Sequence, residues 1–585
     1  MTVFTGKSEA YSKLLHEDVL KVFQQSFSSF TDVQIKAGKE LLTFNDVIVE
    51  SPTGSGKTLS FLLPLFTLLK NRTKLEKLDI GALIVSPSRE LAKQIANVAK
   101  PYADALGYTI GTAIGGSKSE NSYKSLIKNG GNILIATPGR LYQVLEMDKD
   151  EKIQRRLKKL EVFIADEADR FNETQFEVHI KAILAAIPRQ RRTGLFSATQ
   201  AKEKSDLAVF SLRNAKTIKL RENNDTVAPS SLNNFYTVCE AAEKLMCAIE
   251  FIRNHKDKKI LLFFPSCCGV VYFRAILEHV KLKRKIFAVH GKSSQKQRTD
   301  EIANFRKNDN SIMLSTDVMS RGIDIEDIDW VIQFEIPKLS SWFIHRAGRT
   351  ARCGREGNAL LILTPQQTAY TQFLETHEKV ALKELHVKTS NADKAKQLRE
   401  KIIKMACADR SFLEKGTKAF VSHIESYVKH DCNVVCGLKA LDVPGLAHCY
   451  GILRLPKMRE LSERADLSKF ERSEIDTSTI PYLNEKMEAK REEIMKVKHD
   501  KRVAFKKQKA IDLAEKNKRM NKGKEPPKKL TKEEKAKAEK DEKNLKRKAT
   551  KEAQKERDDF ESDVQLIRKM KRGRLSRKEM NDLRI

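Results

Sequence analysis

The chain lacks the apolar segments that mark secretion or membrane insertion. Residues 1–10 contain no apolar core of a signal peptide. No stretch approaches the ~18 consecutive apolar residues of a membrane span, and the apolar run Leu59–Leu69 is short and includes Ser60, Pro64 and Thr67. Cysteine is sparse: nine are scattered through 585 residues, which is typical of reduced thiols and not of a disulfide framework. We therefore expect an intracellular protein with no membrane association.

Four potential zinc ligands lie near one another in the sequence. Cys432 and Cys436 have the spacing C-x-x-x-C, and His430 and Cys449 are nearby. No second ligand pair of standard spacing follows them, so a zinc site is the less favoured of two interpretations. We expect buried thiols instead.

Positive charge is in large excess. Lysine and arginine number 110 against 78 acids, a formal net charge of +32 at pH 7. This excess favours a polyanionic partner, with nucleic acid as the first candidate, and a merely basic surface as the alternative. Lysine, glutamate and arginine dominate Glu485–Arg557, where Pro526 and Pro527 would interrupt any helix. This segment can bury little apolar surface, so we expect it to be partly helical or disordered until bound.

Two series of short apolar runs alternate with amphipathic segments, a pattern typical of βαβ units and of parallel sheets buried on both faces. The polar segment Arg221–Ser231, which contains Pro229, separates the two series as a linker. A small, mainly helical domain is expected over Thr376–Glu463, with a helix at Arg410–Tyr427. The expected strands are Val47–Glu50, Ala82–Ser86, Ile133–Ala136, Val162–Ala165 and Gly194–Phe196, then Lys259–Phe264, Lys285–Val289, Ile312–Ser315, Trp330–Gln333 and Ala359–Leu363.

A phosphate-binding loop is predicted directly after the first strand. Small residues lead from that strand into the apolar run Leu59–Leu69, and glycines there let backbone N–H groups turn toward phosphate oxygens. Lys57 would reach the outer phosphates, and the Thr58 hydroxyl would ligate Mg²⁺. Ser51 stands where the common pattern has glycine, and an ordinary Gly/Ser loop is the alternative. The loop consists of Ser51, Pro52, Thr53, Gly54, Ser55, Gly56, Lys57 and Thr58.

A second acidic site is predicted where the strand Val162–Ala165 ends in Asp166, Glu167 and Asp169. A strand end beside a phosphate loop is where a carboxylate can contact Mg²⁺ through water, the role we assign to Asp166. Glu167 is the candidate general base that polarises the attacking water. The alternative is the acidic first turn of a helix.

The segment Asp166-Glu167-Ala168-Asp169 resembles the signature of the DEAD-box RNA helicases, and other segments over about residues 10–375 follow that family's order. Ser26–Gln34 resembles the adenine-reading motif, although Ser26, Phe30 and Asp32 replace the usual Gly and Pro residues; its upstream aromatic is either Phe4 or Tyr11. The other matching segments are Pro87–Leu91, Gly115-Gly116, Thr137–Arg140, Ser197–Thr199, Phe263–Ser266, Gln295 with Arg298, Ser315–Asp317, Arg321–Asp324 and His345–Arg352.

The resemblance implies two tandem RecA-like parallel-sheet domains that bind ATP and Mg²⁺ between them. RNA would lie across both domains, held by its backbone, and closure would bend one strand and separate short duplexes. The implied catalytic residues are Glu167, Asp166, Lys57, Arg349, Arg352 and His345, with the two arginines as arginine fingers. The implied ATP contacts are Thr31, Gln34, residues 51–58, Gly322 and Asp324, and Mg²⁺ contacts are Thr58 and Asp166. RNA contacts are Pro87, Arg89, Gly116, Thr137, Arg140, Arg298 and Thr316, and Ser197 and Thr199 couple hydrolysis to unwinding.

The resemblance also suggests a narrower role. Gly416–Glu460, Ala228–Leu232 and Ser51-Pro52 are similar to one DEAD-box subgroup that acts in assembly of the large (60S) ribosomal subunit. We expect a first domain at 1–225, a second at 226–375, a helical extension at 376–465 and a basic tail at 466–585. The expected partners are pre-ribosomal RNA in pre-60S particles and other assembly factors, for a monomer in the nucleus and nucleolus.

Three alternatives remain open from the sequence. The enzyme could serve another RNA pathway, such as splicing or messenger export. It could be an ATP-gated RNA clamp or scaffold with little unwinding. The extension could only support the second domain without binding RNA.

Overall fold

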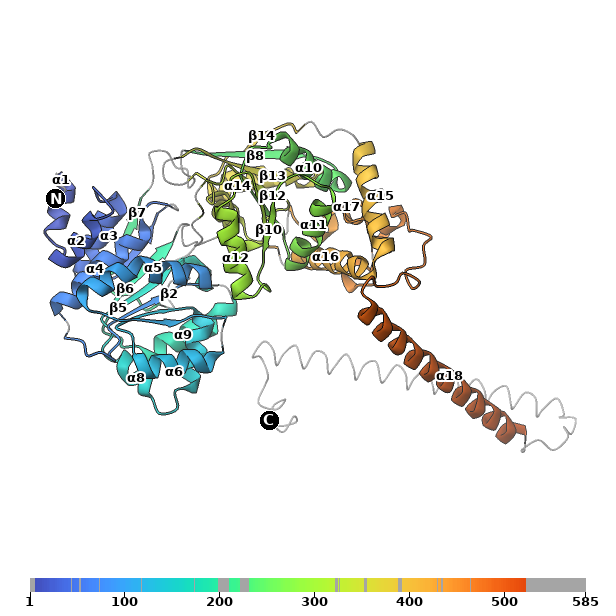
Figure 1. Ribbon diagram of the computed structural model, residues 1–585, viewed down its shortest axis with the longest axis horizontal. Helices are drawn as coiled ribbons and strands as arrows, with labels where there is room; N and C mark the ends of the chain where they lie inside the picture. Colours follow the sequence, from blue (N-terminus) through green and yellow to red (C-terminus); the bar gives the residue numbers. More distant parts are fainter. Residues whose placement is uncertain are drawn as a thin grey trace, which may run out of the picture. The chain divides into compact units, whose positions relative to one another are not determined.

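The computed structural model describes residues 6–521, except 44, 52–53, 73, 117, 173, 198–209, 221–230, 321–324, 326, 352–354, 388–391, 429, 433–434 and 463. The chain divides into two units, residues 1–484 and 485–585. The first unit contains two parallel sheets of seven strands each (Figure 1), which confirms the predicted fold class.

The first sheet has the strand order β3-β4-β2-β5-β6-β1-β7. Its central strands are buried on both faces: Ala82 and Ile84 of one strand lie in one hydrophobic cluster, whereas Leu83 and Val85 lie in another. The strands are β1 (Val47–Glu50), β2 (Ala82–Val85), β3 (Ile110–Ala113), β4 (Ile133–Ala136), β5 (Val162–Asp166), β6 (Arg192–Ser197) and β7 (Lys216–Lys219). The helices are α1 (Gly6–Ser12), α2 (Glu17–Gln24), α3 (Asp32–Leu42), α4 (Lys57–Arg72), α5 (Arg89–Leu106), α6 (Ser119–Asn129), α7 (Pro138–Met147), α8 (Lys152–Leu157), η1 (Ala168–Asn172) and α9 (Thr174–Ala186).

The second sheet has the order β10-β11-β9-β12-β13-β8-β14. Its strands are β8 (Leu232–Val238), β9 (Ile260–Phe263), β10 (Ile286–Val289), β11 (Ile312–Ser315), β12 (Trp330–Gln333), β13 (Gly357–Leu363) and β14 (Lys383–Glu384). Its helices are η3 (Ala241–Glu243), α10 (Lys244–Asn254), α11 (Cys267–His279), α12 (Gln295–Arg306), η4 (Asp317–Met319), α13 (Ser340–Ala347), η5 (Pro365–Gln367) and α14 (Tyr370–Glu378). All ten strands predicted from the sequence are present, and the expected domain boundaries remain predictions.

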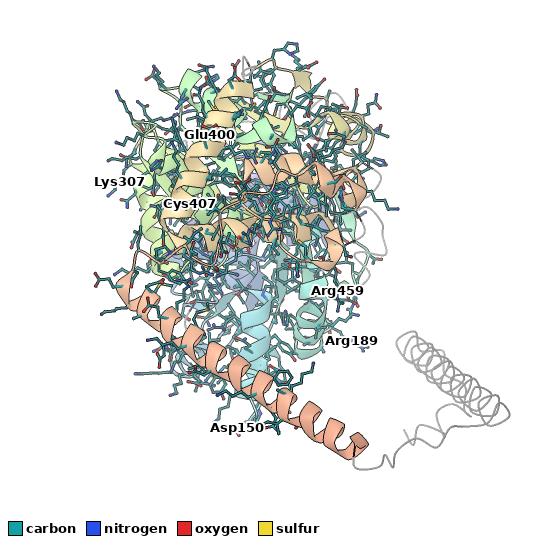
Figure 2. All side chains as sticks on the ribbon, turned by 90° about the vertical axis from the view of Figure 1, so that its right-hand side faces the viewer. Asp150, Arg189, Lys307, Glu400, Cys407 and Arg459 are labelled. Atoms are coloured by element: carbon teal, nitrogen blue, oxygen red, sulfur yellow. The ribbon has the colours of Figure 1, made fainter. Side chains whose placement is uncertain are left out.

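The helical extension shares one hydrophobic core with the second sheet. Phe420, Ile424 and Leu446 belong to the same buried cluster as the central strands β9 and β12. A Cβ atom added at Gly416 would lie 3.0 Å from the Tyr272 ring, so the extension helix approaches α11 closely. The elements are α15 (Ala392–Ala408; Glu400 and Cys407 are labelled on it in Figure 2), α16 (Arg410–Val428), η6 (Leu438–Ala440), α17 (Val443–Cys449), η7 (Arg459–Leu461) and η8 (Ala465–Lys469).

Three of the potential zinc ligands are the buried free thiols Cys432, Cys436 and Cys449, as expected. They belong to no cluster of metal-ligating side chains found among the described residues. The second unit begins with the long helix α18 (Glu485–Asn521), which confirms the partly helical tail. In the part of the chain that is described, no helix combines the length and apolar character that crossing a membrane requires.

Candidate nucleotide and RNA site

The predicted phosphate loop connects β1 to α4. Gly54 and Gly56 have φ values of 82° and 92°, in the region that favours glycine. A Cβ atom at Gly56 would lie 2.6 Å from Nε2 of Gln34. The Lys57 ammonium donates to the carbonyl of Ser51 at 2.9 Å, so it lies across the loop. Pro52 and Thr53 are outside the described residues.

The adenine-reading motif contacts this loop. The Gln34 amide donates to the carbonyl of Gly56 at 3.4 Å and accepts from the backbone N–H of Thr31 at 3.0 Å. Thr31 and Gln34 thus form a capping box at the start of α3. Tyr11 is fully buried with its ring 5.0 Å from that of Phe30, which leaves it in the core. Phe4, the other possible aromatic, lies outside the described residues.

Two carboxylates meet at the end of β5. Burial, followed by repulsion from Glu167, raises the pKa of Asp166 to about 7, against an opposing effect of Lys57. Glu167 is buried, has a φ of 53° and donates its backbone N–H to Asp166 at 3.1 Å. Backbone strain of this kind clusters at functional sites, and it also occurs in turns and at helix ends, as at Lys281 and Lys379. A divalent cation would relieve the repulsion between these two acids, so the donor set fits Mg²⁺.

The raised pKa of Asp166 predicts how the stability of the protein depends on pH. The folded protein disfavours the ionised form of Asp166. Ionisation therefore does not reduce the unfolding free energy below the unfolded pKa near 4, and it reduces this free energy progressively as the pH rises to about 7. Without nucleotide or Mg²⁺, Asp166→Asn should match the wild type at pH 4 and be more stable at pH 8. The gain should be on the order of 1–4 kcal/mol, since one pKa unit corresponds to about 1.4 kcal/mol. Thermal unfolding at both pH values measures it.

The control for this prediction is Asp104→Asn, which changes an exposed carboxyl on the same domain. It should alter stability little at either pH. A stability difference between Asp166→Asn and the wild type that does not change with pH would contradict the assignment.

Residues of α13, in the second domain, meet this acidic strand end. Nε2 of His345 lies 3.3 Å from Oδ2 of Asp169, and Glu167, Asp169 and His345 place their ligating atoms within 4.8 Å of one another. The Arg170 guanidinium lies over the Trp342 ring, 5.6 Å from its centre. The structure therefore brings His345 of the second domain to the predicted catalytic acids. These contacts of Asp169 and Trp342 were not predicted, although Asp169 stands in the acidic motif and Trp342 lies three residues before His345.

Ser197 links the end of β6 to the phosphate loop. It is paired with Glu50 across the sheet, and its carbonyl accepts from the backbone N–H of Ser51 at 3.1 Å. This hydrogen bond joins the end of β6 to the phosphate loop, and the coupling role of Ser197 stays a prediction. Thr199 lies outside the described residues.

The predicted RNA residues of the first domain collect at one edge of its sheet. Pro87 and Arg89 follow β2, and Thr137 and Arg140 follow β4, its parallel neighbour. Burial, followed by the charge of Arg89, lowers the pKa of Arg140. The two side chains therefore add positive charge to the same edge, which suits a phosphate backbone. Gly116, also predicted here, has a φ of 112°.

The predicted RNA residues of the second domain lie in two places. Arg298 is buried and forms an ion pair with Glu90 of the first domain at 2.9 Å, and Gln295 contacts the same carboxylate. Thr316 directly precedes η4. Contact of these residues with RNA stays a prediction, and their contact with Glu90 was not predicted.

Three family models match the chain. A DEAD/DEAH box helicase model matches residues 31–207, and a helicase conserved C-terminal domain model matches residues 242–354. A model described as the ATP-dependent rRNA helicase SPB4-like, C-terminal extension, matches residues 409–458. The chain is 50% identical to the probable ATP-dependent RNA helicase DDX55 homolog of Caenorhabditis briggsae, over 98% of each chain. It is 38% identical to ATP-dependent RNA helicase DDX55 of Homo sapiens, over 84% of this chain and 83% of the human one.

The chain belongs to the DEAD-box ATP-dependent RNA helicases. A solved structure of the DEAD-box protein Mss116p bound to single-stranded RNA and AMP-PNP has a TM-score of 0.70 with it and 25% sequence identity, and covers 80% of this chain and 98% of that one. This similarity supports ATP binding and RNA binding by the same two-domain architecture.

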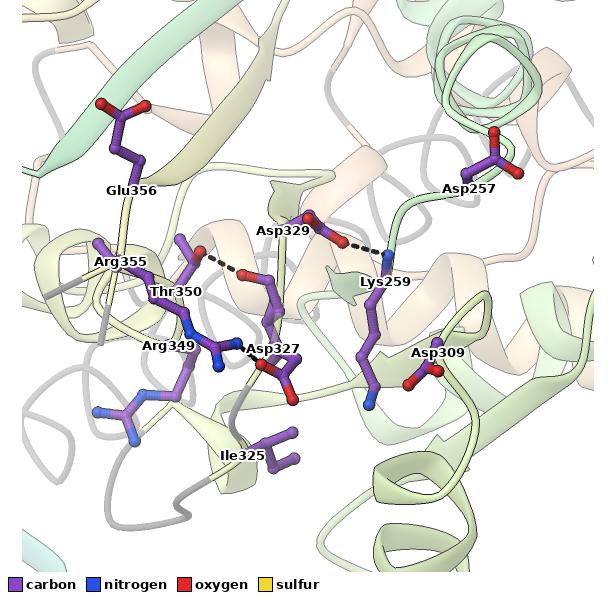
Figure 3. A pocket seen from close by; sticks show the side chains of 12 residues that line it. Asp257, Lys259, Asp309, Ile325, Asp327, Asp329, Arg349, Thr350, Arg355 and Glu356 are labelled. Carbon is purple, nitrogen blue, oxygen red and sulfur yellow. Dashed lines mark hydrogen bonds and ion pairs between the residues drawn. The ribbon is translucent and has the colours of Figure 1, made fainter. Parts of the chain in front are cut away.

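The predicted arginine fingers of this DEAD-box chain follow α13. Arg349 is buried, and its Nε donates to the carbonyl of His345 at 3.2 Å. It borders a cavity of about 400 Å³ that carboxylates line, among them Asp257, Asp309 and Asp329 (Figure 3). Five carboxylates line it against the three cations Lys259, Arg349 and Arg355, and this net negative charge disfavours the nucleotide phosphates there. In Figure 3 the Arg349 guanidinium lies away from Asp257 and Asp309. Arg352, Gly322 and Asp324 are outside the described residues.

Proposed function

We propose that this DEAD-box helicase uses ATP and Mg²⁺ to separate short duplexes within pre-ribosomal RNA during assembly of the large ribosomal subunit. The observation that carries the proposal is the matched C-terminal extension at residues 409–458, whose description names an rRNA helicase. The extension packs into the core of the second domain, so it is an integral part of the enzyme.

The nucleotide site supports a division of roles. When bound, Mg²⁺ would neutralise phosphate charge and be held by Asp166 and Thr58. Lys57 would hold the outer phosphates, and Glu167 would orient the attacking water and accept its proton. Arg349 and Arg352 would stabilise charge on the transferred phosphoryl group from the second domain.

RNA recognition would depend on the backbone. Arg89 and Arg140 follow two neighbouring strands at one sheet edge, where their guanidiniums suit phosphate oxygens and carry no base specificity. The tail adds a second basic region: after residue 484, lysine and arginine outnumber the acids by 36 to 21. Each phosphate that such residues neutralise contributes salt-dependent affinity. We propose a monomer that works with other assembly factors in the nucleus, within the nucleolus.

Crosslinking the full-length protein to RNA in cells tests this proposal. We expect most crosslinked fragments to come from precursor RNA of the large ribosomal subunit. A chain ended after Asn484 should lose a subset of these sites if the tail contacts the same RNA. A majority of messenger or splicing RNAs in the full-length sample would reject the ribosomal assignment and favour another RNA pathway.

A further inference from the structure

The helix that carries His345 has no capping side chain from its own segment. Leu339, at the N-cap of α13, has only a hydrocarbon side chain, although Ser, Thr, Asp and Asn are favoured there. Oδ2 of Asp431 instead accepts from the backbone N–H of Ser340 at 2.9 Å, and the Asp431 N–H donates to the carbonyl of Lys338 at 3.0 Å. A carboxylate at this end also suits the helix dipole. Asp431 follows α16, so the extension supplies the missing cap.

The extension also reaches the other end of α13. The Tyr427 hydroxyl on α16 donates to Oε1 of Glu335 at 3.0 Å. The carbonyl of Glu335 accepts from Nη1 of Arg346 at 3.2 Å. Arg346 also contacts Asp317 through two hydrogen bonds of 2.5 and 2.9 Å. Tyr427 is therefore connected, through one glutamate, to the residue that directly follows His345.

Both connections converge on groups of the ATPase site. His345 lies 3.3 Å from Asp169 of the acidic motif, and its carbonyl accepts from Arg349. A small rotation of α13 would move both side chains. We propose that Asp431 and Tyr427 are positioning residues, through which the C-terminal extension holds α13 in the orientation that ATP hydrolysis requires.

The experiment compares Asp431→Ala with Asp431→Asn in the full-length protein. The alanine variant loses the acceptor for Ser340 N–H, so kcat of RNA-stimulated ATP hydrolysis should fall several-fold, with an upper limit of about 100-fold for misplaced groups. KM for ATP should change little, because the phosphate loop lies in the first domain. The asparagine variant keeps an oxygen acceptor and should restore most of kcat.

The matched control is Tyr272→Phe. It removes a buried hydroxyl that donates to the carbonyl of Tyr450 at 2.6 Å, at the interface between α11 and the extension; this hydrogen bond does not involve α13. It should lower the unfolding temperature and leave kcat near the wild-type value.

A second variant covers the case in which Asp431→Ala folds poorly. Tyr427→Phe keeps the ring and removes only the hydroxyl, and it should lower kcat in the same way. Wild-type kcat in a folded Asp431→Ala protein, equal losses in the alanine and asparagine variants, or a kcat loss in Tyr272→Phe as large as in Tyr427→Phe would overturn the proposal.

Discussion

Replacing Glu167 with glutamine should lower kcat of RNA-stimulated ATP hydrolysis by about 10²–10⁴-fold, the usual contribution of general-base catalysis. The amide is nearly isosteric but cannot take a proton from water. Glu167 is buried beside Asp166, and the substitution leaves the size and shape of its side chain almost unchanged. ATP and RNA should therefore still bind, and the complex should persist. Steady-state hydrolysis together with RNA retention in the presence of ATP measures both effects.

The matched control for this variant is Glu161→Gln. Glu161 precedes the same strand at its opposite end, where it pairs with Arg192 at 3.2 Å. This change should leave turnover unaltered. Wild-type turnover in Glu167→Gln would remove Glu167 from its assigned role. Loss of ATP binding in that variant would show that the side chain is needed for the shape of the site.

The parallel sheets were predictable because their central strands are continuous runs of branched apolar residues. β3, β7, β8 and β14 were not predicted, because they lack such a run. β3 contains Gly111 and Thr112 and is only partly buried, and β7 is the sequence Lys-Thr-Ile-Lys at an exposed edge. The helices of the extension were predicted, but their shared core with the second domain was not, because an amphipathic pattern shows that a face is buried and not what covers it.

The site was predictable where its residues are neighbours in the sequence. The phosphate loop needs only a strand, small residues and a helix in succession, and Asp166 needs only to end a strand. Asp431 could not be assigned a role, because it caps a helix 91 residues away. The buried group around Glu335 was missed for the same reason: its partners Lys244, Gln367 and His423 come from three distant segments.

The buried group around Glu335 predicts a large effect on stability. Glu335 and Lys244 are almost fully buried, with Nζ and Oε2 2.7 Å apart, and His423 lies 3.3 Å from the same oxygen. Burial alone would raise the pKa of Glu335. The effects of Lys244 and His423 lower it by more, so the pKa of Glu335 lies well below its ordinary value. Glu335 is therefore charged, and Lys244→Met would leave that charge without its ammonium partner. Breaking such a pair typically costs about 3–5 kcal/mol.

The expected result is a large fall in the unfolding free energy of the second domain in Lys244→Met, measured by denaturant unfolding near pH 7. Lys258→Met is the control, because Lys258 pairs with Asp329 at 3.4 Å with half of its side chain exposed and should contribute at most about 1 kcal/mol. Adding Glu335→Gln to Lys244→Met removes the buried charge and should restore part of the lost stability.

The depressed pKa of Glu335 also sets the pH dependence of stability. The contribution of Glu335 is complete above about pH 4.3, its pKa in the unfolded chain, and is lost as the pH falls below that value. If Lys244→Met and Lys258→Met were equally stable, the charge of Glu335 would not need Lys244, and water or His423 would be sufficient to stabilise it.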